Sequence, residues 1–357
     1  MMRRLQQVGR LLPLFAVLAL MLTGCSSDPY LSALTPKGPA AEMQLFMMKL
    51  SLYVMLFVFA VVVAIFAYVL VRYRKRKGDN SIPEQVEGNH KLEIIWTVIP
   101  FLLLIVIAVP MVSTTFTLAK DYSQDKEAVK VKVTAHQFWW EFDYPEAKIK
   151  TAQELYIPVG KKVWLELTSA DVIHSFWVPG IAGKIDTNPG MKNTMWLEAS
   201  EEGVFQGKCA ELCGASHALM DFKVKVVSQE EFDAWVAKMS KEKPESTTDG
   251  ADTALAAEGE KIFQQSCVSC HAIDGNGGKI GPDLSNYSER QTVAGFLRND
   301  PTHTGDEAVR TENLKKNLHK WLSNPEEVKP GNLMKIGQLK PEEVDALTEY
   351  LSNLKRQ

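Results

Sequence analysis

Two long apolar runs dominate the first third of the chain. Leu45 to Val71 and Ile94 to Val112 are almost wholly apolar, and each reaches the length of about 20 residues that a helix needs to cross a bilayer. The second run contains Pro100 and Pro110, which membrane helices tolerate when neighbouring helices satisfy the freed carbonyls. The pattern therefore predicts a two-helix hairpin in a membrane.

The loop between the two runs is strongly basic. Arginine and lysine occupy nearly every position from Arg72 to Lys77. Positive loops stay on the cytoplasmic side of a membrane, so everything after Val112 is expected on the outer face.

The first 24 residues have the pattern of an export signal. Arg3 and Arg4 precede the apolar stretch Leu11 to Leu22, which ends in Leu-Thr-Gly before Cys25. These small residues before a cysteine resemble a bacterial lipobox, which implies cleavage before Cys25, diacylation of its thiol and a place in the bacterial cell membrane. The alternative is an unmodified signal or a short anchor.

From Ala128 to Val227 the apolar positions alternate with a period of two, as in Val129, Val131 and Val133. Glycine, proline and asparagine interrupt this pattern at regular intervals. The segment therefore predicts an antiparallel β domain, either a sandwich or a small barrel.

Beyond the β segment the pattern becomes helical. Glu230 to Lys241 predicts a short helix, Lys243 to Asp252 is a polar linker, and a helical domain runs from Ala254 to the end. The predicted organisation is a signal peptide at 1–24, a membrane hairpin at 25–120, a β domain at 121–228, a helix and linker at 229–252, and a helical domain at 253–357.

Length and charge narrow the class of protein. A chain of 357 residues has room for two or three compact units beside a membrane part. Its net charge of -3 is small and its charges are interspersed, which excludes the large basic face of a nucleic-acid-binding protein.

The densest chemical signal lies between Cys209 and Met220. Cys209 and Cys213 are followed by His217 and Met220, and thiolate, imidazole and thioether ligands together suit copper. A disulfide is the commoner fate of two extracellular cysteines, but it leaves the histidine and methionine unexplained. Zinc is disfavoured because methionine is a poor zinc ligand. His174 follows a predicted strand and is a candidate second imidazole, with a buried core histidine as the alternative.

These residues resemble subunit II of the haem–copper cytochrome c oxidases, whose cysteine loop reads C-x-E-x-C-x-x-x-H-x-x-M. All five specified positions match. The resemblance implies a cupredoxin-like Greek-key fold and a binuclear copper centre of the CuA type. It assigns bridging ligands to Cys209 and Cys213, terminal ligands to His174 and His217, and weak axial ligands to Met220 and the backbone carbonyl of Glu211.

The resemblance implies two further sites. The carboxylate of Glu211 would reach a magnesium or manganese ion shared with subunit I. Glu93, in Glu-Ile-Ile-Trp-Thr at the start of the second apolar run, would lie at the cytoplasmic mouth of a proton channel; the alternative is a solvated helix-end carboxylate. Mitochondrial relatives have a tryptophan that receives the electron of an external cytochrome c where this chain has Phe138. The neighbouring Trp139 and Trp140 can equally be core aromatics.

The C-terminal domain contains a haem attachment motif. Cys267, Cys270 and His271 form C-x-x-C-H, which predicts thioether bonds to haem c and a histidine ligand to its iron. A thioredoxin-like redox pair is the alternative, but it gives no role to His271.

A second iron ligand is expected because an electron-transfer haem is six-coordinate, and a methionine raises its reduction potential. Met334 is the only methionine after the linker, and its surroundings resemble the distal loop of class I cytochromes c. Lys335 replaces the proline that usually follows, so His303 and His319 remain alternatives. Gly281 to Leu284 resembles the segment that packs beside the proximal histidine.

The combination of modules resembles the caa-type cytochrome c oxidases, whose subunit II carries its own cytochrome c. The expected fold is therefore multidomain, with a two-helix transmembrane hairpin, an all-β cupredoxin-like domain and an all-α class I cytochrome c domain. The resemblance implies oxidase subunits I and III as partners and a cytochrome c or a quinol–cytochrome c reductase as donor. The rival functions are a quinol oxidase subunit II, a copper chaperone, and a component of a nitric or nitrous oxide reductase.

Overall fold

The computed structural model describes residues 30–75, 78, 82, 85, 87–240, 246–247, 253–300 and 305–356. The predicted signal peptide, the lipidation site Cys25 and the alternative iron ligand His303 lie outside these residues. So does the predicted linker, apart from residues 246–247.

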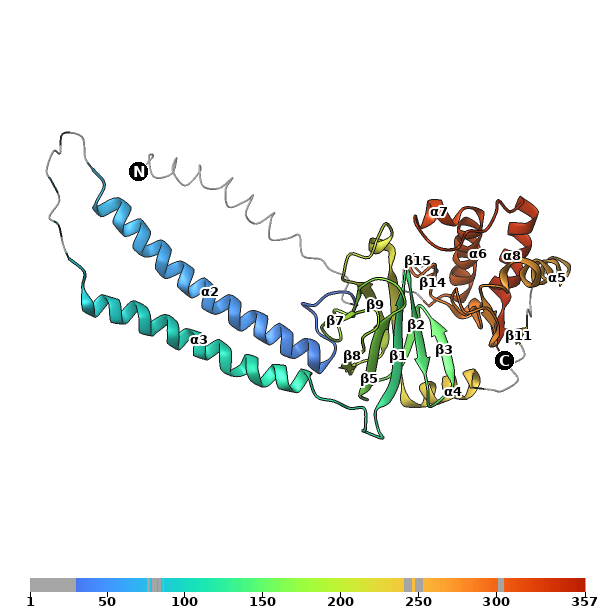
Figure 1. Cartoon of the computed structure of the whole chain (residues 1–357), viewed down its shortest axis with the longest axis horizontal. Coiled ribbons are helices and arrows are strands. Elements are labelled where there is room, and N and C mark those ends of the chain that lie inside the picture. The colour runs from blue at the N-terminus through green and yellow to red at the C-terminus, as the bar shows by residue number, and fades with distance from the viewer. Residues whose placement is uncertain are drawn as a thin grey trace, which may run out of the picture.

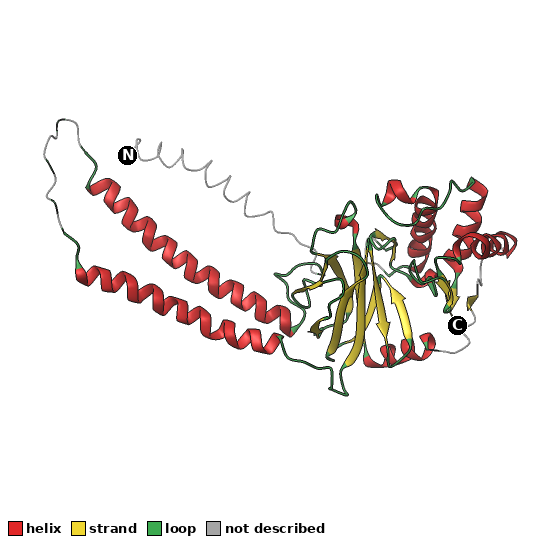
Figure 2. Cartoon of the chain, in the orientation of Figure 1, coloured by secondary structure: helices red, strands yellow, loops and turns green. Residues whose placement is uncertain are grey.

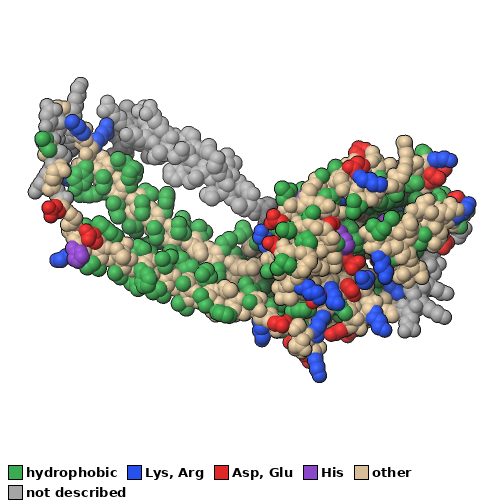
Figure 3. Space-filling view, viewed as in Figure 1, with side chains coloured by type: hydrophobic (Ala, Val, Ile, Leu, Met, Phe, Trp, Pro, Cys, Tyr) green, Lys and Arg blue, Asp and Glu red, His purple; other side chains and the backbone are tan. Residues whose placement is uncertain are grey.

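Two long helices form the predicted hairpin. Helix α2 spans Pro39–Arg72 and helix α3 spans His90–Leu118, and they lie side by side (Figure 1). Both are longer than their apolar runs. At the start of α3 the side chain of Asn89 caps the backbone N–H groups of the first turn. Both helices are long and apolar enough to cross a membrane, and apolar side chains cover the visible face of the hairpin (Figure 3).

The segment between Val129 and Val227 folds into two five-stranded sheets. One sheet has the order β3-β2-β1-β5-β8 and the other the order β4-β10-β9-β6-β7. The strands are β1 (Val129–His136), β2 (Trp139–Tyr144), β3 (Ile149–Ala152), β4 (Glu154–Pro158), β5 (Val163–Ser169), β6 (His174–Trp177), β7 (Lys184–Thr187), β8 (Asn193–Leu197), β9 (Gly203–Cys209) and β10 (Asp221–Val227).

The prediction of a purely antiparallel domain was wrong in one respect. Strand β1 runs parallel to β5, and β4 runs parallel to β10. A period of two shows which side chains face the core, but it does not show in which direction a neighbouring strand runs.

The sandwich core is aromatic at the end near the cysteine loop. Trp140, Phe176 and Phe222 are fully buried and pack with ring centroids 4.7 to 5.6 Å apart. Gly207 of β9 lies under one of these rings, because a Cβ atom there would lie 2.1 Å from Phe222. This packing fixes β6, β9 and β10, the strands that border the cysteine loop.

A short helix follows the sandwich. Helix α4 spans Gln229–Met239, close to the predicted 230–241. Trp235 stacks on Tyr156 of β4 with ring centroids 4.5 Å apart, so the helix packs against the sheet.

The C-terminal domain is mainly helical (Figure 2). Helix α5 (Thr253–Ile262), helix α6 (Glu307–Ser323), helix α7 (Pro325–Val328) and helix α8 (Pro341–Asn353) are joined by irregular segments. These segments contain a π-helical turn at Phe263–Cys267, the short helix Tyr287–Glu289 and two-residue strand pairs. Helix α8 packs closely on α5, since a Cβ atom on Gly259 would lie 2.1 Å from the carbonyl oxygen of Ala346.

The three parts lie in a row. The hairpin joins one side of the sandwich, and the helical domain lies beside the sandwich on the side away from the hairpin (Figure 1). The fold thus places the sandwich between the membrane helices and the helical domain.

Candidate copper and haem sites

Four predicted copper ligands converge around the cysteine loop between β9 and β10. The Sγ atoms of Cys209 and Cys213 lie 3.9 Å apart. His217 Nδ1 lies 3.6 Å and Met220 Sδ 3.8 Å from the Sγ of Cys213.

Strand β6 brings the fifth predicted ligand to the cluster. His174 begins this strand and is fully buried, and its Nδ1 lies 3.9 Å from Cys209 Sγ. The alternative of a core histidine without a partner at the cysteines is therefore disfavoured.

The backbone supplies a further donor. The carbonyl oxygen of Glu211 lies 3.2 Å from Cys209 Sγ, while the side chain of Glu211 is exposed. The carbonyl thus faces the cluster and leaves the carboxylate free for another contact.

The two thiols are not joined to each other. Their separation of 3.9 Å is far beyond the bond length of about 2.05 Å in a disulfide. Both cysteines are free and buried.

Sheet pairing positions the cysteine loop. The N–H of Cys209 donates to the carbonyl of Met220 at 3.1 Å, and the N–H of Ala210 donates to the carbonyl of Ser175 at 3.0 Å. The first bond closes the loop on itself, and the second ties it to β6 beside His174.

Asp171 orients His174. Its Oδ1 lies 2.7 Å from Nε2 of His174, which leaves Nδ1 to face the thiols. The backbone N–H of Gln137 donates to Asp171 at 2.7 Å, and the Gln137 side chain donates to the carbonyl of Cys213 at 2.5 Å. Partners of this kind fix the tautomer of a metal-bound histidine. Neither Asp171 nor Gln137 was identified from the sequence, although a carboxylate three residues before a predicted ligand histidine is a signal that could have found Asp171.

The paired thiols favour one negative charge over two. The hydrogen bond between the two sulfurs lowers the pKa of Cys209 to about 3 and raises the pKa of Cys213. Two thiolates this close repel each other, so the second ionisation requires a cation beside them.

The donor set fits copper. Two ligand atoms on one ion, each bonded at about 2.0–2.3 Å, lie roughly 3.3–3.8 Å apart in a tetrahedral arrangement, and the separations around Cys209 and Cys213 are 3.6 to 3.9 Å. Sulfur and imidazole donors without a carboxylate select a soft metal ion.

The helical domain contains a large apolar cavity. Its volume is about 530 Å³, which is in the range of roughly 300–1,000 Å³ typical of cofactor pockets. Cys267, Cys270, His271 and Met334 all line it, and Trp321, Leu347 and Leu351 form part of its apolar wall.

His271 is prepared to bind a metal. Its Nδ1 donates to the carbonyl of Pro282 at 2.8 Å, so Nε2 is free, and burial lowers its pKa and keeps the ring neutral. Gly281 packs against the ring, because a Cβ atom there would lie 2.6 Å from His271. The predicted packing of this segment beside the histidine is confirmed.

The two candidate second ligands in the described part of the chain differ in position. Met334 lines the cavity. His319 is about half exposed and lies 3.4 Å from Asp345, and it does not line the cavity. The geometry therefore favours Met334.

The aromatic residues near the cysteine loop take different positions. Trp140 is a core residue, whereas Phe138 and Trp139 line the cavity of the helical domain. Trp139 also stacks on His136 with ring centroids 4.1 Å apart. The sandwich thus contributes part of the wall of the haem pocket.

Glu93 lies far from both sites. It is in the first turn of α3, where it is exposed and its carboxylate lies 3.4 Å from His90.

Fold and sites together define a membrane protein with a copper-binding cupredoxin-like domain and a c-type cytochrome domain. Three family models match the chain: cytochrome c oxidase subunit II transmembrane domain at residues 35–113, the periplasmic domain of the same subunit at 147–227, and cytochrome c at 256–355.

Similar proteins agree with these matches. Cytochrome c oxidase subunit 2 of Alkalihalophilus pseudofirmus is 47% identical over 99% of this chain and 99% of its own length. The subunit 2 of Bacillus sp. (strain PS3) is 47% identical over 97% of each chain. Quinol oxidase subunit 2 of Bacillus spizizenii is 35% identical over 86% of this chain and 94% of its own length.

The chain belongs to the cytochrome c oxidase subunit II family. It has a cytochrome c domain and a CuA-type domain, which imply haem c and copper, and its role is electron transfer in a terminal oxidase with subunit I. Its two helices and its periplasmic domains are those of a membrane protein.

Proposed function

We propose that this chain receives electrons at a haem c in its own cytochrome domain and passes them through a binuclear copper centre to subunit I. The observation that carries the proposal is the convergence of three side chains, His174, His217 and Met220, and one carbonyl on two unbridged cysteine sulfurs. A single soft-metal site needs fewer donors than this set provides.

The copper ligands follow from the contacts. Cys209 and Cys213 would bridge two ions, and each lies beside one imidazole, His174 in the first case and His217 in the second. Met220 and the carbonyl of Glu211 lie at the two sides of the cluster and would be the weak axial ligands.

Copper and haem c each supply a carrier of one electron when bound. The chain supplies a rigid and largely dry cage, because Cys209, Cys213 and Met220 are buried and sheet bonds fix the loop at both ends. Ligand positions that do not shift between redox states keep the reorganisation energy low, which suits electron transfer better than catalysis.

The haem ligands are assigned in the same way. Cys267 and Cys270 would form the thioether bonds, and the free Nε2 of His271 would bind the iron. Met334 would be the sixth ligand, and its thioether would raise the reduction potential.

The tip of the cysteine loop is the proposed contact with subunit I. Glu211 is exposed, and the neighbouring Leu212 is 78% exposed. A magnesium or manganese ion at this boundary would take the carboxylate of Glu211. Glu211→Gln in the assembled oxidase should lower manganese binding; unchanged binding would remove this part of the proposal.

A lipid on Cys25 would attach the chain to the membrane in addition to the two helices. The backbone carbonyl of Tyr30 accepts a hydrogen bond from Gln206, and the backbone N–H of Lys37 donates to Gly180, so residues 30–37 pack on the sandwich. This position supports a diacylated Cys25 on the outer face of the bacterial cell membrane. The proposed domain limits remain 25–120, 121–228, 229–252 and 253–357.

The remaining proposed partners are the other subunits of the oxidase and its electron donor. Oxygen reduction and proton pumping would take place in subunit I, with subunit III beside it and Glu93 at the mouth of a proton channel. The donor would be a cytochrome c or a quinol–cytochrome c reductase. A quinol oxidase subunit II is disfavoured, because its function requires neither the copper ligands nor the haem motif.

The test is Cys213→Ser in the assembled oxidase. A donor should still reduce the haem at an unchanged rate, while oxygen consumption is lost because electrons stop before the copper site. Lys316→Met, on the exposed face of α6, is the control and should behave as wild type. Normal oxygen consumption in the Cys213 variant would contradict the proposal.

A further inference from the structure

A loop of the cytochrome domain lies on the cysteine loop of the copper domain. The hydroxyl of Ser216 donates to the carbonyl of Pro330 at 2.6 Å. Ser216 is fully buried and directly precedes the proposed copper ligand His217. Residues 329–334, which we name the haem loop, end at the proposed iron ligand Met334, so one hydrogen bond joins the ligand loops of the two sites.

Phe138 lies between the two loops. A Cβ atom on Gly214 of the cysteine loop would lie 3.1 Å from its ring, and one on Gly331 of the haem loop would lie 3.7 Å from it. Phe138 is only 4% exposed and lines the haem cavity. Its ring is therefore in contact with both loops and borders the haem pocket.

Lys329 anchors the start of the haem loop. Its side chain is buried, and Nζ donates to the carbonyl of Phe138 and to the carbonyl of Ala294, each at 2.7 Å. One bond therefore reaches across to the copper domain and the other stays within the cytochrome domain.

Burying the Lys329 amine costs free energy unless both of its hydrogen bonds form. Burial lowers the pKa of Lys329 to about 7, and leaving either carbonyl without its donor would add a desolvation cost. A neutral amine still has two N–H groups, so both carbonyls can be satisfied in either protonation state. A buried lysine held by two carbonyls therefore favours one position of the haem loop.

We propose that Lys329 is a positioning residue that holds the haem loop on the cysteine loop and so sets the rate at which an electron crosses between the two sites of this chain. The inference rests on the proposed function. In the step concerned, one electron leaves the haem site, which is oxidised, and arrives at the copper site, which is reduced, with no other reactant. The same contact keeps Phe138 covered, so an external donor cannot deliver its electron at this ring.

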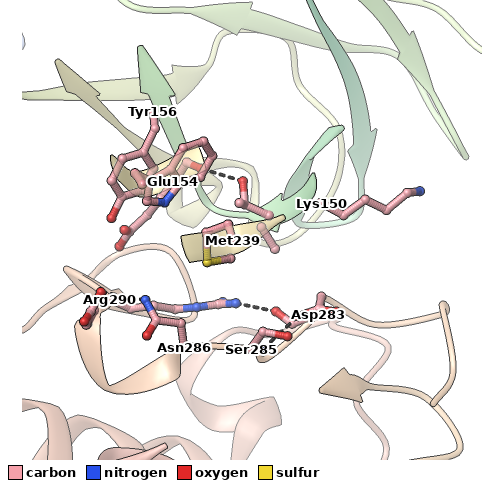
Figure 4. Close-up of a pocket in the computed structure, with 12 residues that line it drawn as sticks. Lys150, Glu154, Tyr156, Met239, Asp283, Ser285, Asn286 and Arg290 are labelled. Carbon is pink, nitrogen blue, oxygen red and sulfur yellow. Dashed lines mark hydrogen bonds between the residues drawn. The ribbon is translucent and has the colours of Figure 1, made fainter. Parts of the chain in front are cut away.

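Other contacts between the domains lie away from the two loops. The backbone N–H of Gln291 donates to Glu154 at 2.5 Å, and Lys238 pairs with Glu289 at 2.8 Å. A small pocket lies between the two domains at these contacts. Figure 4 shows Glu154 and Tyr156 on its sandwich side, opposite Asn286 and Arg290 of the cytochrome domain. These contacts should keep the domains together when Lys329 is changed. The loss of contact between the domains should therefore be confined to the haem loop.

The test is Lys329→Met in the full chain within the oxidase. We expect hydrogen exchange to rise in segments 136–140 and 214–217. Electron transfer from haem to copper after flash reduction should slow about tenfold, because the hydrogen bond that reaches across to the carbonyl of Phe138 is lost. The haem and copper absorption spectra should not change. Lys316→Met is the matched control, with the same chemical change on an exposed helix face, and should alter neither measurement.

Ser216→Ala provides a second test if the methionine variant does not assemble. It removes one hydroxyl from the same contact and should slow the same transfer by a smaller factor. Unchanged exchange and an unchanged transfer rate in either assembled variant, with normal spectra, would overturn the role of Lys329. A wild-type chain without a copper or low-spin haem spectrum would instead overturn the proposed function.

Discussion

Asp171 Oδ1 lies 2.7 Å from Nε2 of His174 and thereby turns the other ring nitrogen toward Cys209. The carboxylate is held in turn by the backbone N–H groups of Gln137 and Val172. The orientation of one proposed copper ligand is therefore set by a residue that does not touch the metal site itself.

Removing this carboxylate should weaken the copper site. Asp171→Ala is expected to lower copper affinity about 10- to 100-fold, because His174 loses the partner that fixes its tautomer. Competition with a copper chelator measures the change. Asp186→Ala, at an exposed position of β7, is the control, and equal affinities in the two variants would show that Asp171 has no such role.

The second iron ligand can be identified by substitution. Met334→Ala should convert the haem from low spin to high spin and lower its reduction potential, because the thioether stabilises the reduced iron. Absorption spectroscopy with a redox titration measures both effects. His319→Ala should change neither, since His319 does not line the cavity; a low-spin haem in the Met334 variant would rule out the assignment.

The aromatic core should dominate the stability of the copper domain. Trp140 is fully buried and its ring packs against His174, Phe176 and Phe222. Trp140→Ala should lower the free energy of unfolding by about 3–5 kcal/mol, as expected for a large cavity. Denaturant unfolding followed by circular dichroism gives the value, and Lys132→Ala on the exposed side of β1 should change it by less than about 0.5 kcal/mol.

Acid should weaken the contact between the two outer domains. Burial opposes ionisation of Glu289, but hydrogen bonds from Lys238 and Asn286 leave its pKa below the usual 4.5. A carboxyl group with a lowered pKa stabilises the docked form above pH 4.5, and this contribution is lost as the pH falls through the lowered pKa. Hydrogen exchange at segment 283–291 should rise over that range, and Glu289→Gln should remove the dependence. A wild-type response that persists in the variant would assign it to another group.

Much of this architecture could be predicted because its signals are local. The apolar runs, the period of two and the ligand spacings in C-x-E-x-C and C-x-x-C-H each lie within a few turns or strands. The ends of the helices are harder to predict from apolar runs, because the Asn89 cap lets α3 begin before its apolar run.

The contacts that position the sites could not be predicted in this way. Gln137 and Cys213 are 76 residues apart, and Lys329 and Phe138 are 191 residues apart. These pairs depend on how sheets and domains pack, and no local pattern of polar and apolar residues encodes that packing. The parallel pairing of β1 with β5 could not be predicted either, because it also depends on how distant strands pack.

The proposed function requires that Cys209 and Cys213 hold two copper ions that share one unpaired electron. Electron paramagnetic resonance of the full chain purified with copper tests it most directly. Hyperfine structure from two equivalent copper nuclei is expected beside the signal of a low-spin haem. The signal of a single isolated copper ion, or a covalent bond between the two cysteines in the metal-loaded protein, would contradict it.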